Sequence, residues 1–196
     1  MSGRDLFEVL FESCEEAGIL GVIVGGYALP AYGVFRTTVD RDFCIRVKDQ
    51  EQLDRFVAVL REKGIYTTQN PRVGHLLFFV QGKLGEAEIW LSPIGDLEWD
   101  EEMVKRVLTF RGEFKVLSVE DFVAAKLGRE GRSTTDLKDV IQILVSNAES
   151  VDLVYLRFRL EKSGLWEDFV QLVNAREVKE RLLSAAPRLA ELVDGE

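Results

Sequence analysis

Residues 19–43 read ILGVIVGGYALPAYGVFRTTVDRDF, and this stretch decides the fold. Its continuous apolar run from Ile19 to Val24 is rich in Ile and Val, which predicts a buried strand. The run ends at Gly25-Gly26, and a short helix is predicted to follow. Apolar and polar residues then alternate from Val39 to Val47, which predicts a second strand. The stretch is therefore predicted to be a strand, a glycine turn, a short helix and a strand.

The flanking sequence predicts an α+β protein. The first half alternates helical and strand patterns, and the second half is mostly helical in pattern. Helices are predicted around Leu6–Cys14, at 50–63, 119–129 and 135–145 and beyond 151, and further strands at 65–69, 75–81, 86–91, 104–110 and 114–117. We expect a mixed β-sheet of about four or five strands with helices packed on one face, followed by a mainly helical C-terminal half.

The predicted organisation has two regions. Residues 1–95 form the sheet-bearing core, and residues 96–196 form a β-hairpin followed by a helical region. No internal repeat, low-complexity tract or Gly/Ser linker separates them. The stretch around Pro93 to Asp100 is the best candidate for the boundary.

Charge and hydropathy exclude several classes of partner. The 196 residues include 25 Lys and Arg against 34 Asp and Glu, a net charge of −9. Such a protein binds nucleic acid or anionic membranes poorly without a specific site. Its apolar runs are too short to span a bilayer, and its N-terminus lacks the basic start and apolar core of a signal peptide. A cytoplasmic protein without membrane contact is expected.

The sequence contains few of the side chains that bind zinc or iron. The chain has a single histidine, His75, and two cysteines, Cys14 and Cys44, each within an apolar pattern and without a CxxC partner. These residues cannot supply a structural zinc site or a 2-His-1-carboxylate iron site. Any metal must be held by oxygen ligands, which points to Mg²⁺ or Mn²⁺.

Two acids on the second predicted strand suggest such a metal. Asp40 and Asp42 are two residues apart, so both carboxylates are expected to project from one face. Neighbouring carboxylates repel each other, and a Mg²⁺ ion between them relieves the repulsion. Gly25 and Gly26 follow a buried strand, and their backbone N–H groups are suited to cradle a phosphate. An anion cradle beside a cation holder suits a nucleoside triphosphate bound with its metal.

A third acid is expected from a neighbouring strand, because two-metal sites need further oxygen ligands. The predicted strand from Glu86 to Leu91 offers Glu86 and Glu88 on one face. Glu88 lies deeper in the apolar run and is the first choice. Glu86 remains the alternative.

These residues carry a family resemblance. The stretch GGYALPAYGVFRTTVDRDF, residues 25–43, resembles the signature GGxAxxxxGxxRxTxDxD of small nucleotidyltransferases of the DNA-polymerase-β-like superfamily. It is most similar to the minimal nucleotidyltransferase branch that includes the toxins of abortive-infection systems. The stretch LSVEDFVAAKLGREGRSTTDLKDV, residues 117–140, is also similar to that branch. The resemblance covers roughly residues 19–145.

The resemblance implies catalytic roles in the first region. Gly25 and Gly26 would hold the phosphates of the nucleotide, and Asp40 and Asp42 would bind the catalytic metals. Glu88 would be the third metal-binding acid and would help to activate the attacking hydroxyl. The family usually has Asp at this third position.

The resemblance also implies roles for cations. Arg36 and Thr37 would lie beside the phosphates, and Lys126 would reach the nucleotide from the second region. Asp136 is similar to a further acidic position of the family motif.

Ordinary ion pairing is an alternative explanation for several of these residues. Arg36 could neutralise Asp40 or Asp42 without a metal. Ion pairs between two packed helices would account equally well for four residues of the second region: Lys126, Arg132, Asp136 and Asp139.

The predicted function is a metal-dependent nucleotidyltransferase that moves a nucleoside monophosphate from a nucleoside triphosphate to a hydroxyl acceptor. The acceptor is an RNA end, a protein or a small molecule. A transfer RNA end is what the toxin resemblance implies, whereas the net charge of −9 argues against an extensive RNA surface. The alternative is a non-catalytic nucleotidyltransferase-fold module in a toxin–antitoxin-like system, with a cognate protein partner or a second copy of the chain.

Overall fold

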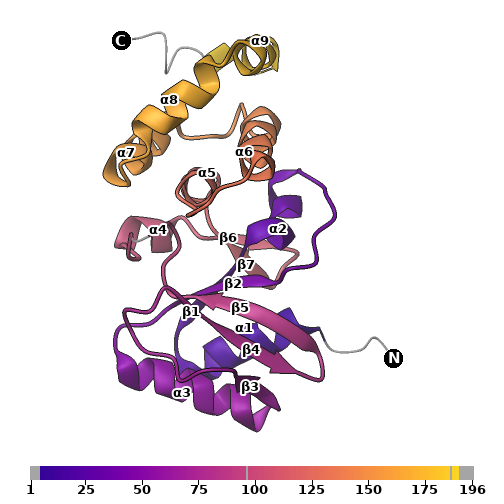
Figure 1. Cartoon of the computed structure of the whole chain (residues 1–196), viewed down its shortest axis with the longest axis vertical. Coiled ribbons are helices and arrows are strands. Elements are labelled where there is room, and N and C mark those ends of the chain that lie inside the picture. The colour runs from indigo at the N-terminus through magenta and orange to yellow at the C-terminus, as the bar shows by residue number, and fades with distance from the viewer. Residues whose placement is uncertain (1–4, 96, 186, 190–196) are drawn as a thin grey trace. The chain divides into compact units, whose positions relative to one another are not determined.

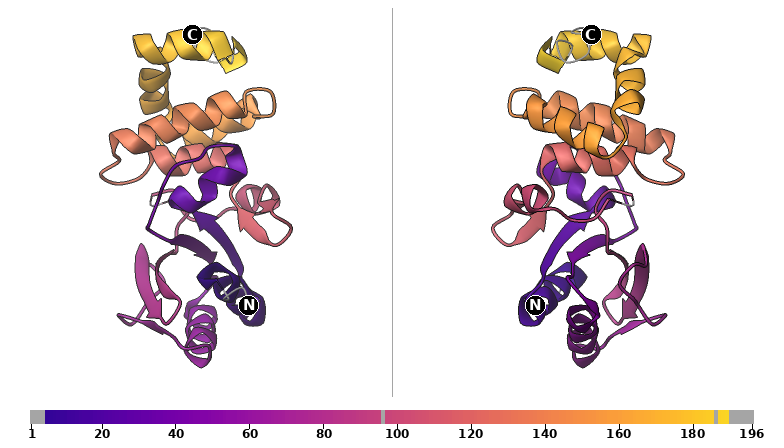
Figure 2. Two further views of the ribbon diagram at one scale, coloured as in Figure 1. Left: turned by 90° about the vertical axis from the view of Figure 1, so that its right-hand side faces the viewer. Right: turned by 90° about the vertical axis from the view of Figure 1, so that its left-hand side faces the viewer.

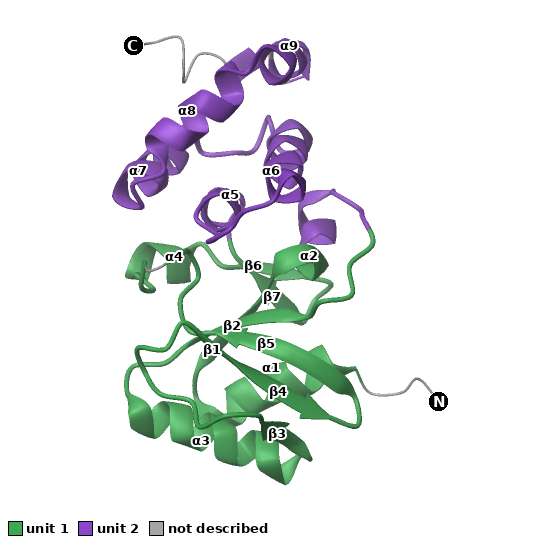
Figure 3. Ribbon diagram, viewed as in Figure 1, with its two compact units in different colours: residues 1–28, 37–117 green, residues 29–36, 118–196 purple. Residues whose placement is uncertain are grey.

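The computed structural model describes residues 5–95, 97–185 and 187–189. They form two compact units (Figure 3). One comprises the chain up to Ala28 together with Thr37–Leu117, and the other comprises Leu29–Arg36 and the chain from Ser118. The first unit holds a mixed β-sheet and the second is helical, which confirms the predicted α+β class.

The sheet of the first unit has seven strands in the order β3-β4-β5-β2-β1-β7-β6 (Figure 1). The pairs β2/β5 and β1/β7 are parallel, and the other four neighbouring pairs are antiparallel. The strands are β1 (Leu20–Val24), β2 (Asp42–Arg46), β3 (Ile65–Thr67), β4 (Leu77–Gly82), β5 (Gly85–Trp90), β6 (Leu108–Phe110) and β7 (Phe114–Val116).

Two helices, α1 (Leu6–Ala17) and α3 (Gln50–Glu62), pack side by side on one face of this sheet (Figures 1 and 2). The ring of Phe43 on β2 is fully buried beneath α1, with its centroid 5.0 Å from that of Phe11. Lys63, at the end of α3, reaches back to Glu16 of α1 at 2.6 Å. The core of the first unit therefore lies between the sheet and these two helices.

The strands alternate strictly between this core and the opposite face, which we call the distal face. On β4, Phe78 and Val80 are buried against the helices, while Phe79 between them is exposed. On β5, Ala87 and Ile89 face the core, so Glu88 lies on the distal face. The predicted candidate acid is thus placed on the side of the sheet away from α1 and α3.

The hairpin is shorter than predicted and belongs to the sheet. Its first strand begins at Leu108 because Asp100 caps a short helix, α4 (Glu101–Lys105), through a hydrogen bond to its side chain from the Met103 amide. β7 pairs in parallel with β1, so the hairpin lies in the first unit instead of with the C-terminal helices. This pairing extends the expected four or five strands to seven and differs from the predicted division at residues 95 and 96.

In its described residues, the second unit combines five helices with the segment Leu29–Arg36, which carries the 3-10 helix η1 (Leu29–Tyr32). The Tyr32 ring packs 4.6 Å from the ring of Phe122, and Asn147 donates a hydrogen bond to the Tyr32 carbonyl. The helices are α5 (Val119–Leu127), α6 (Thr134–Ser146), α7 (Leu153–Lys162), α8 (Trp166–Asn174) and α9 (Arg176–Ala185).

A buried charge network joins α5 to α7. Arg159 and Asp121 are both inaccessible to solvent, and the Arg159 Nε lies 2.7 Å from an Asp121 oxygen. The hydroxyls of Tyr155 and Ser118 also donate to Asp121. Burial raises the pKa of Asp121, and the Arg159 charge opposes that rise.

Of the helices in the described part of the chain, none combines the length and the apolar character needed to cross a bilayer.

We predict that Phe43→Ala lowers the free energy of unfolding by about 3–5 kcal/mol, because it leaves a cavity between α1 and the sheet. Urea denaturation followed by circular dichroism measures this loss. Leu108→Ala on β6, where the side chain is exposed, is the control and should cost less than about 1 kcal/mol. Equal losses for the two variants would contradict this account of the core.

Candidate functional site

The pairing of β2 with β5 brings together two acids that are far apart in the sequence. The parallel register places Asp42 directly beside Glu88. Laterally paired residues of neighbouring strands project to the same face, so both carboxylates lie on the distal face. Asp42 is 5% exposed and Glu88 is half-buried. The Glu88 amide donates to the Arg41 carbonyl at 2.8 Å, which fixes this register at the start of β2.

The carboxylate of Asp42 is held on two sides. The indole Nε1 of Trp90 on β5 donates to Asp42 Oδ1 at 3.3 Å. Gly25 lies on the other side, and a Cβ added there would be 1.9 Å from Asp42 Oδ2. Gly25 also has a φ of +64°, a conformation that glycine adopts without strain. The glycine therefore leaves room for the acid and allows the chain to turn into α2 (Gly25–Ala28).

Gly26 is in close contact with a residue that sequence reasoning missed. A Cβ on Gly26 would lie 2.6 Å from Thr38 Oγ1, so the threonine packs directly on the glycine backbone. The sequence-based choice was Thr37, which is exposed in the loop. Thr38 occupies the threonine position of the pattern GGxAxxxxGxxRxTxDxD, and that register was the available signal.

Asp40 lies outside the strand on which it was predicted. β2 begins at Asp42 rather than at Val39, and Asp40 is exposed in the preceding loop. Asp40 and Asp42 therefore do not share a strand face as expected. Glu86 stands at the exposed start of β5, opposite Gln81 of β4.

The site fits a divalent metal in part. Asp42 and Glu88 are adjacent oxygen donors that repel each other, and a hard cation would relieve that repulsion. Across residues 5–95, 97–185 and 187–189, however, no group of three or more His, Cys, Asp or Glu side chains is gathered to hold a metal. Asp40 thus does not join the other two acids in this structure.

The cations singled out from the sequence belong to the second unit, where they meet carboxylates. Lys126 on α5 is 4% exposed, and its Nζ lies 3.0 Å from both Asp136 and Asp139 of α6. Arg36 donates through Nε and Nη2 to the carboxylate of Asp139, with both shortest contacts at 3.1 Å. The partner of Arg36 is therefore Asp139, and not Asp40 or Asp42 as the ion-pair alternative supposed.

The expected ion pairs between helices α5 and α6 are present for Lys126, whereas Arg132 has a different partner. Arg132 donates to Asp168 of α8 at 2.6 Å. Asp136 also closes a capping box with Ser133 at the start of α6. Burial raises the pKa of Asp136, but hydrogen bonds from Ser133 and the charge of Lys126 outweigh that effect and lower the pKa to about 2.

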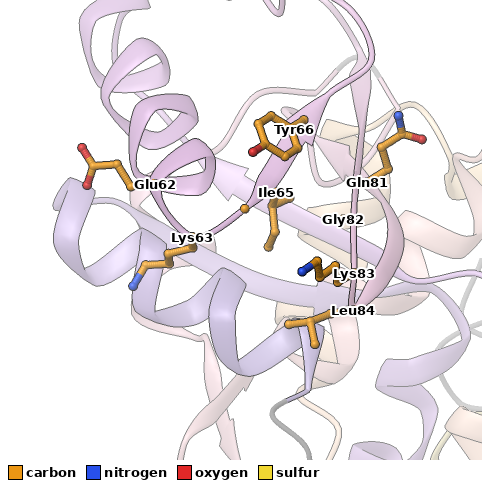
Figure 4. Close-up of a pocket in the computed structure, with 9 residues that line it drawn as sticks. Glu62, Lys63, Ile65, Tyr66, Gln81, Gly82, Lys83 and Leu84 are labelled. Carbon is orange, nitrogen blue, oxygen red and sulfur yellow. The ribbon is translucent and has the colours of Figure 1, made fainter.

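A pocket of about 710 Å³ lies at the β3 edge of the first unit's sheet, where α3 ends beside β3 and β4 (Figure 4). Its lining includes Lys63, Tyr66, Gln81 and Lys83. None of the site residues predicted from the sequence lines it, so this cavity is separate from the acid pair.

We predict that Gly25→Ala destabilises the protein more than Gly64→Ala does. Both glycines have positive φ, but a Cβ at Gly64 meets no atom within 4 Å, whereas one at Gly25 collides with Asp42. The Gly64 variant should lose about 1–2 kcal/mol from backbone strain alone, and the Gly25 variant about 1–3 kcal/mol more. Thermal and urea denaturation measure both, and equal losses would show that the carboxylate moves away freely.

We predict that Asp136 makes stability depend on pH at the acidic end. Its pKa falls from an ordinary 3.8 to about 2 on folding, so its contribution is complete above about pH 4 and is lost as the pH falls toward 2. Asp136→Asn should remove up to about 2 kcal/mol of this dependence. Glu130→Gln, at an exposed acid of the same unit, is the control. Parallel curves of unfolding free energy against pH for the Asp136 variant and the unmodified protein would contradict the prediction.

Comparison with known proteins identifies the fold. No protein-family model matches this chain, and no curated protein matches it. Solved structures do match. The crystal structure of ANT(2″)-Ia in complex with adenylyl-2″-tobramycin aligns with a TM-score of 0.52 at 12% identity, over 81% of this chain and 95% of that one. The solution structure of the antibiotic-resistance factor ANT(2″)-Ia gives 0.52 at 16% identity, over 84% and 95%.

A third similar structure is that of an antigenic nucleotidyltransferase-like protein from Paracoccidioides brasiliensis. It aligns with a TM-score of 0.50 at 18% identity, over 90% of this chain and 89% of that one. Identities this low show a common fold and no more. The chain therefore has the nucleotidyltransferase-like α+β fold predicted from its sequence.

Proposed function

We propose that this protein is a nucleotidyltransferase, which moves a nucleoside monophosphate from a nucleoside triphosphate to a hydroxyl acceptor. One observation carries the proposal. Asp42 and Glu88 lie side by side on the distal face, and Asp42 packs against the Gly25-Gly26 turn. This combination of paired acids and a glycine turn occurs on a nucleotidyltransferase-like fold. ANT(2″)-Ia, which shares the fold, was solved with adenylyl-2″-tobramycin, and the fold-level analogy supports a nucleotide donor here.

Glu88 and Asp42 are proposed to have different roles in the reaction. Glu88 accepts the proton of the acceptor hydroxyl, whose oxygen then attacks the α-phosphorus. A new oxygen–phosphorus bond forms as the bond from that phosphorus to the oxygen bridging to the β-phosphate breaks. Pyrophosphate leaves with the electron pair of the broken bond. The hydrogen bond from Trp90 and the close approach of Gly25 hold the Asp42 carboxylate in one orientation during the reaction.

Mg²⁺ or Mn²⁺ is the cofactor proposed for this site. Asp42 and Glu88 would hold it, with Asp40 as the third acid from the adjoining loop. When bound, the metal would neutralise charge on the triphosphate and on the departing pyrophosphate. The exposed position of Asp40 allows its side chain to turn without disturbing a packed strand.

The phosphates are proposed to lie beside the backbone of Gly25 and Gly26, with Arg36 and Thr37 as further contacts. A bidentate carboxylate already orients the Arg36 guanidinium, which lowers the entropy lost when it binds a phosphate. Lys126 would have to exchange two carboxylate partners to reach a phosphate. Its proposed contribution is therefore to hold Asp139 in place for Arg36.

The finer assignment rests on the sequence resemblance. The pattern at residues 25–43 favours the abortive-infection toxin branch, with an RNA end, a protein or a small molecule as acceptor. A non-catalytic module of a toxin–antitoxin-like system is the second candidate, and the separation of Asp40 from the other acids favours it. Triphosphate binding without any pyrophosphate release would distinguish this second candidate from the enzyme.

We predict that the protein binds a nucleoside triphosphate in the presence of Mg²⁺ or Mn²⁺, and that Asp42→Asn weakens this binding at least about tenfold. The variant removes one carboxylate charge but keeps the side-chain shape, so its loss reports on the metal and not on packing. Isothermal titration calorimetry with each of the four ribonucleoside triphosphates measures the affinity. Circular dichroism confirms that the variant is folded.

Glu113→Gln, at an exposed acid in the turn of the β6–β7 hairpin, is the matched charge control and should bind like the unmodified protein. Equal affinities for all three proteins, or binding that does not require a divalent metal, would contradict the proposed site.

A further inference from the structure

The outer edge of β3 offers backbone groups that β4 does not use. β3 is the last strand on its side of the sheet, and β4 is its strand partner among the described residues. One step beyond the Thr67–Val80 pair, the Thr68 amide donates to the Phe79 carbonyl at 3.1 Å, so these two residues form a hydrogen-bonded pair. Hydrogen-bonded and non-hydrogen-bonded pairs alternate along an antiparallel ladder. The N–H and C=O groups of Ile65 and Thr67 therefore point away from β4, where a further strand can bond to them.

The sequence of β3 does not protect this edge. Strands at the edge of a sheet are usually protected from pairing by a charged residue, a proline or a bulge. Residues 65–67 are Ile, Tyr and Thr, which all favour extended backbone. The Tyr66 side chain is 55% exposed on the distal face, and a side chain of an added strand would pack against it. The edge is thus suited to bind a strand.

The pocket of about 710 Å³ adjoins the same edge (Figure 4). The end of α3, the start of β3, the end of β4 and the turn between β4 and β5 line it. Ile65, whose backbone groups point outward, is one of the lining residues, together with Leu84 and Gln81. A strand that pairs with β3 would therefore have room for one of its side chains in the pocket.

Lys83 gives the pocket its charge. It lies in the two-residue turn between β4 and β5, and its side chain is exposed and makes no ion pair or hydrogen bond with the residues that the structure describes. Figure 4 shows its ammonium group directed into the pocket and the Glu62 carboxylate directed away from it. Lys63 is neutralised by Glu12 and Glu16 of α1, at 3.4 and 2.6 Å. An acidic group that entered the pocket would meet Lys83 as its partner.

From these observations we propose that the outer edge of β3 binds an extended, acidic segment of a partner polypeptide. The segment adds to the sheet as a strand beside β3, with its backbone bonded to Ile65 and Thr67. One of its carboxylate side chains enters the pocket and pairs with Lys83. The backbone bonds supply affinity, and the pocket selects the side chain.

A polypeptide fits this edge better than a small anion does. A free carboxylate or phosphate could pair with Lys83, but it would leave the outward N–H and C=O groups of Ile65 and Thr67 to water. An extended peptide satisfies these groups and the lysine together. The site is separate from the acid pair of Asp42 and Glu88, so the inference does not depend on the proposed nucleotidyl transfer.

The test uses the full chain labelled with ¹⁵N and the peptide acetyl-Thr-Val-Glu-Val-Thr-amide as the probe. A second peptide has Gln in place of Glu, and a third is N-methylated at its three central residues, which removes the backbone donors. Titrations followed by amide chemical shifts give the affinity and the residues affected. The probe should shift the amide signals of Ile65, Thr67 and Lys83.

The proposal predicts that the Glu peptide binds about three- to fivefold more tightly than the Gln peptide, because its carboxylate pairs with a lysine at the surface. The N-methylated peptide should not bind. Lys83→Gln should abolish the preference for the Glu peptide, whereas Lys48→Gln, at an exposed lysine of the same unit, should keep it. Metal-dependent triphosphate binding should be unchanged in both variants.

A further variant tests the edge itself. Thr67→Pro removes one outward N–H at a position where an edge strand tolerates proline, and it should weaken binding of both the Glu and Gln peptides at least about threefold. The amide spectrum shows whether this variant is folded. The N-methylated peptide tests the same bonds on the unmodified protein.

Four results would overturn the inference. They are equal affinity for the Glu and Gln peptides, undiminished binding of the N-methylated peptide, shifts that lie away from β3, and no binding of any peptide. Dimerisation of the peptide-free protein that Thr67→Pro abolishes would also overturn it, because the edge would then belong to a second copy of the chain.

Discussion

The parallel pairing of β2 with β5 is the constraint on which the candidate site depends. It sets Asp42 beside Glu88, although 45 residues separate them in the chain, and it aligns Cys44 with Trp90 on the same face. A shift of one residue in this register would turn Glu88 into the core and expose Ile89. The packing of α1 and α3 on the other face therefore fixes the positions of the acids, because the buried side chains of β2 and β5 allow only one register.

The site is built where two requirements of the fold coincide. The chain must turn sharply after β1, and the Asp42 carboxylate occupies the space just beyond that turn. Glycine at position 25 satisfies both requirements, since it accepts a positive φ and has no side chain to displace the acid. The cost of keeping two carboxylates together on one face is electrostatic, and a divalent cation is the simplest group that offsets it. The stability of the sheet and the proposed chemistry thus rely on the same few residues.

Much of this arrangement could be predicted from the sequence, because apolar alternation over residues 39–47 and 86–91 determines which side chains face the core. The placing of Glu88 on the same face as Asp42 depends only on that periodicity and on the two strands being neighbours in the sheet. The start of β2 could not be predicted, since Val39 and Asp40 continue the alternating pattern into a loop. The strand order could not be predicted from the sequence either, because the β1–β7 pairing joins residues about ninety positions apart. The partner of Arg36, Asp139, is likewise a long-range contact that local pattern does not reveal.

We propose that Asp42 and Glu88 together form the metal-dependent nucleotide site. It is tested most directly by a crystal structure with Mn²⁺ and a non-hydrolysable nucleoside triphosphate, in which anomalous scattering locates the metal. We predict Mn²⁺ coordinated by carboxylate oxygens of Asp42 and Glu88, with the triphosphate beside Gly25 and Gly26. Metal and nucleotide bound elsewhere, such as in the cavity between α3 and the β3–β4 edge, would contradict it.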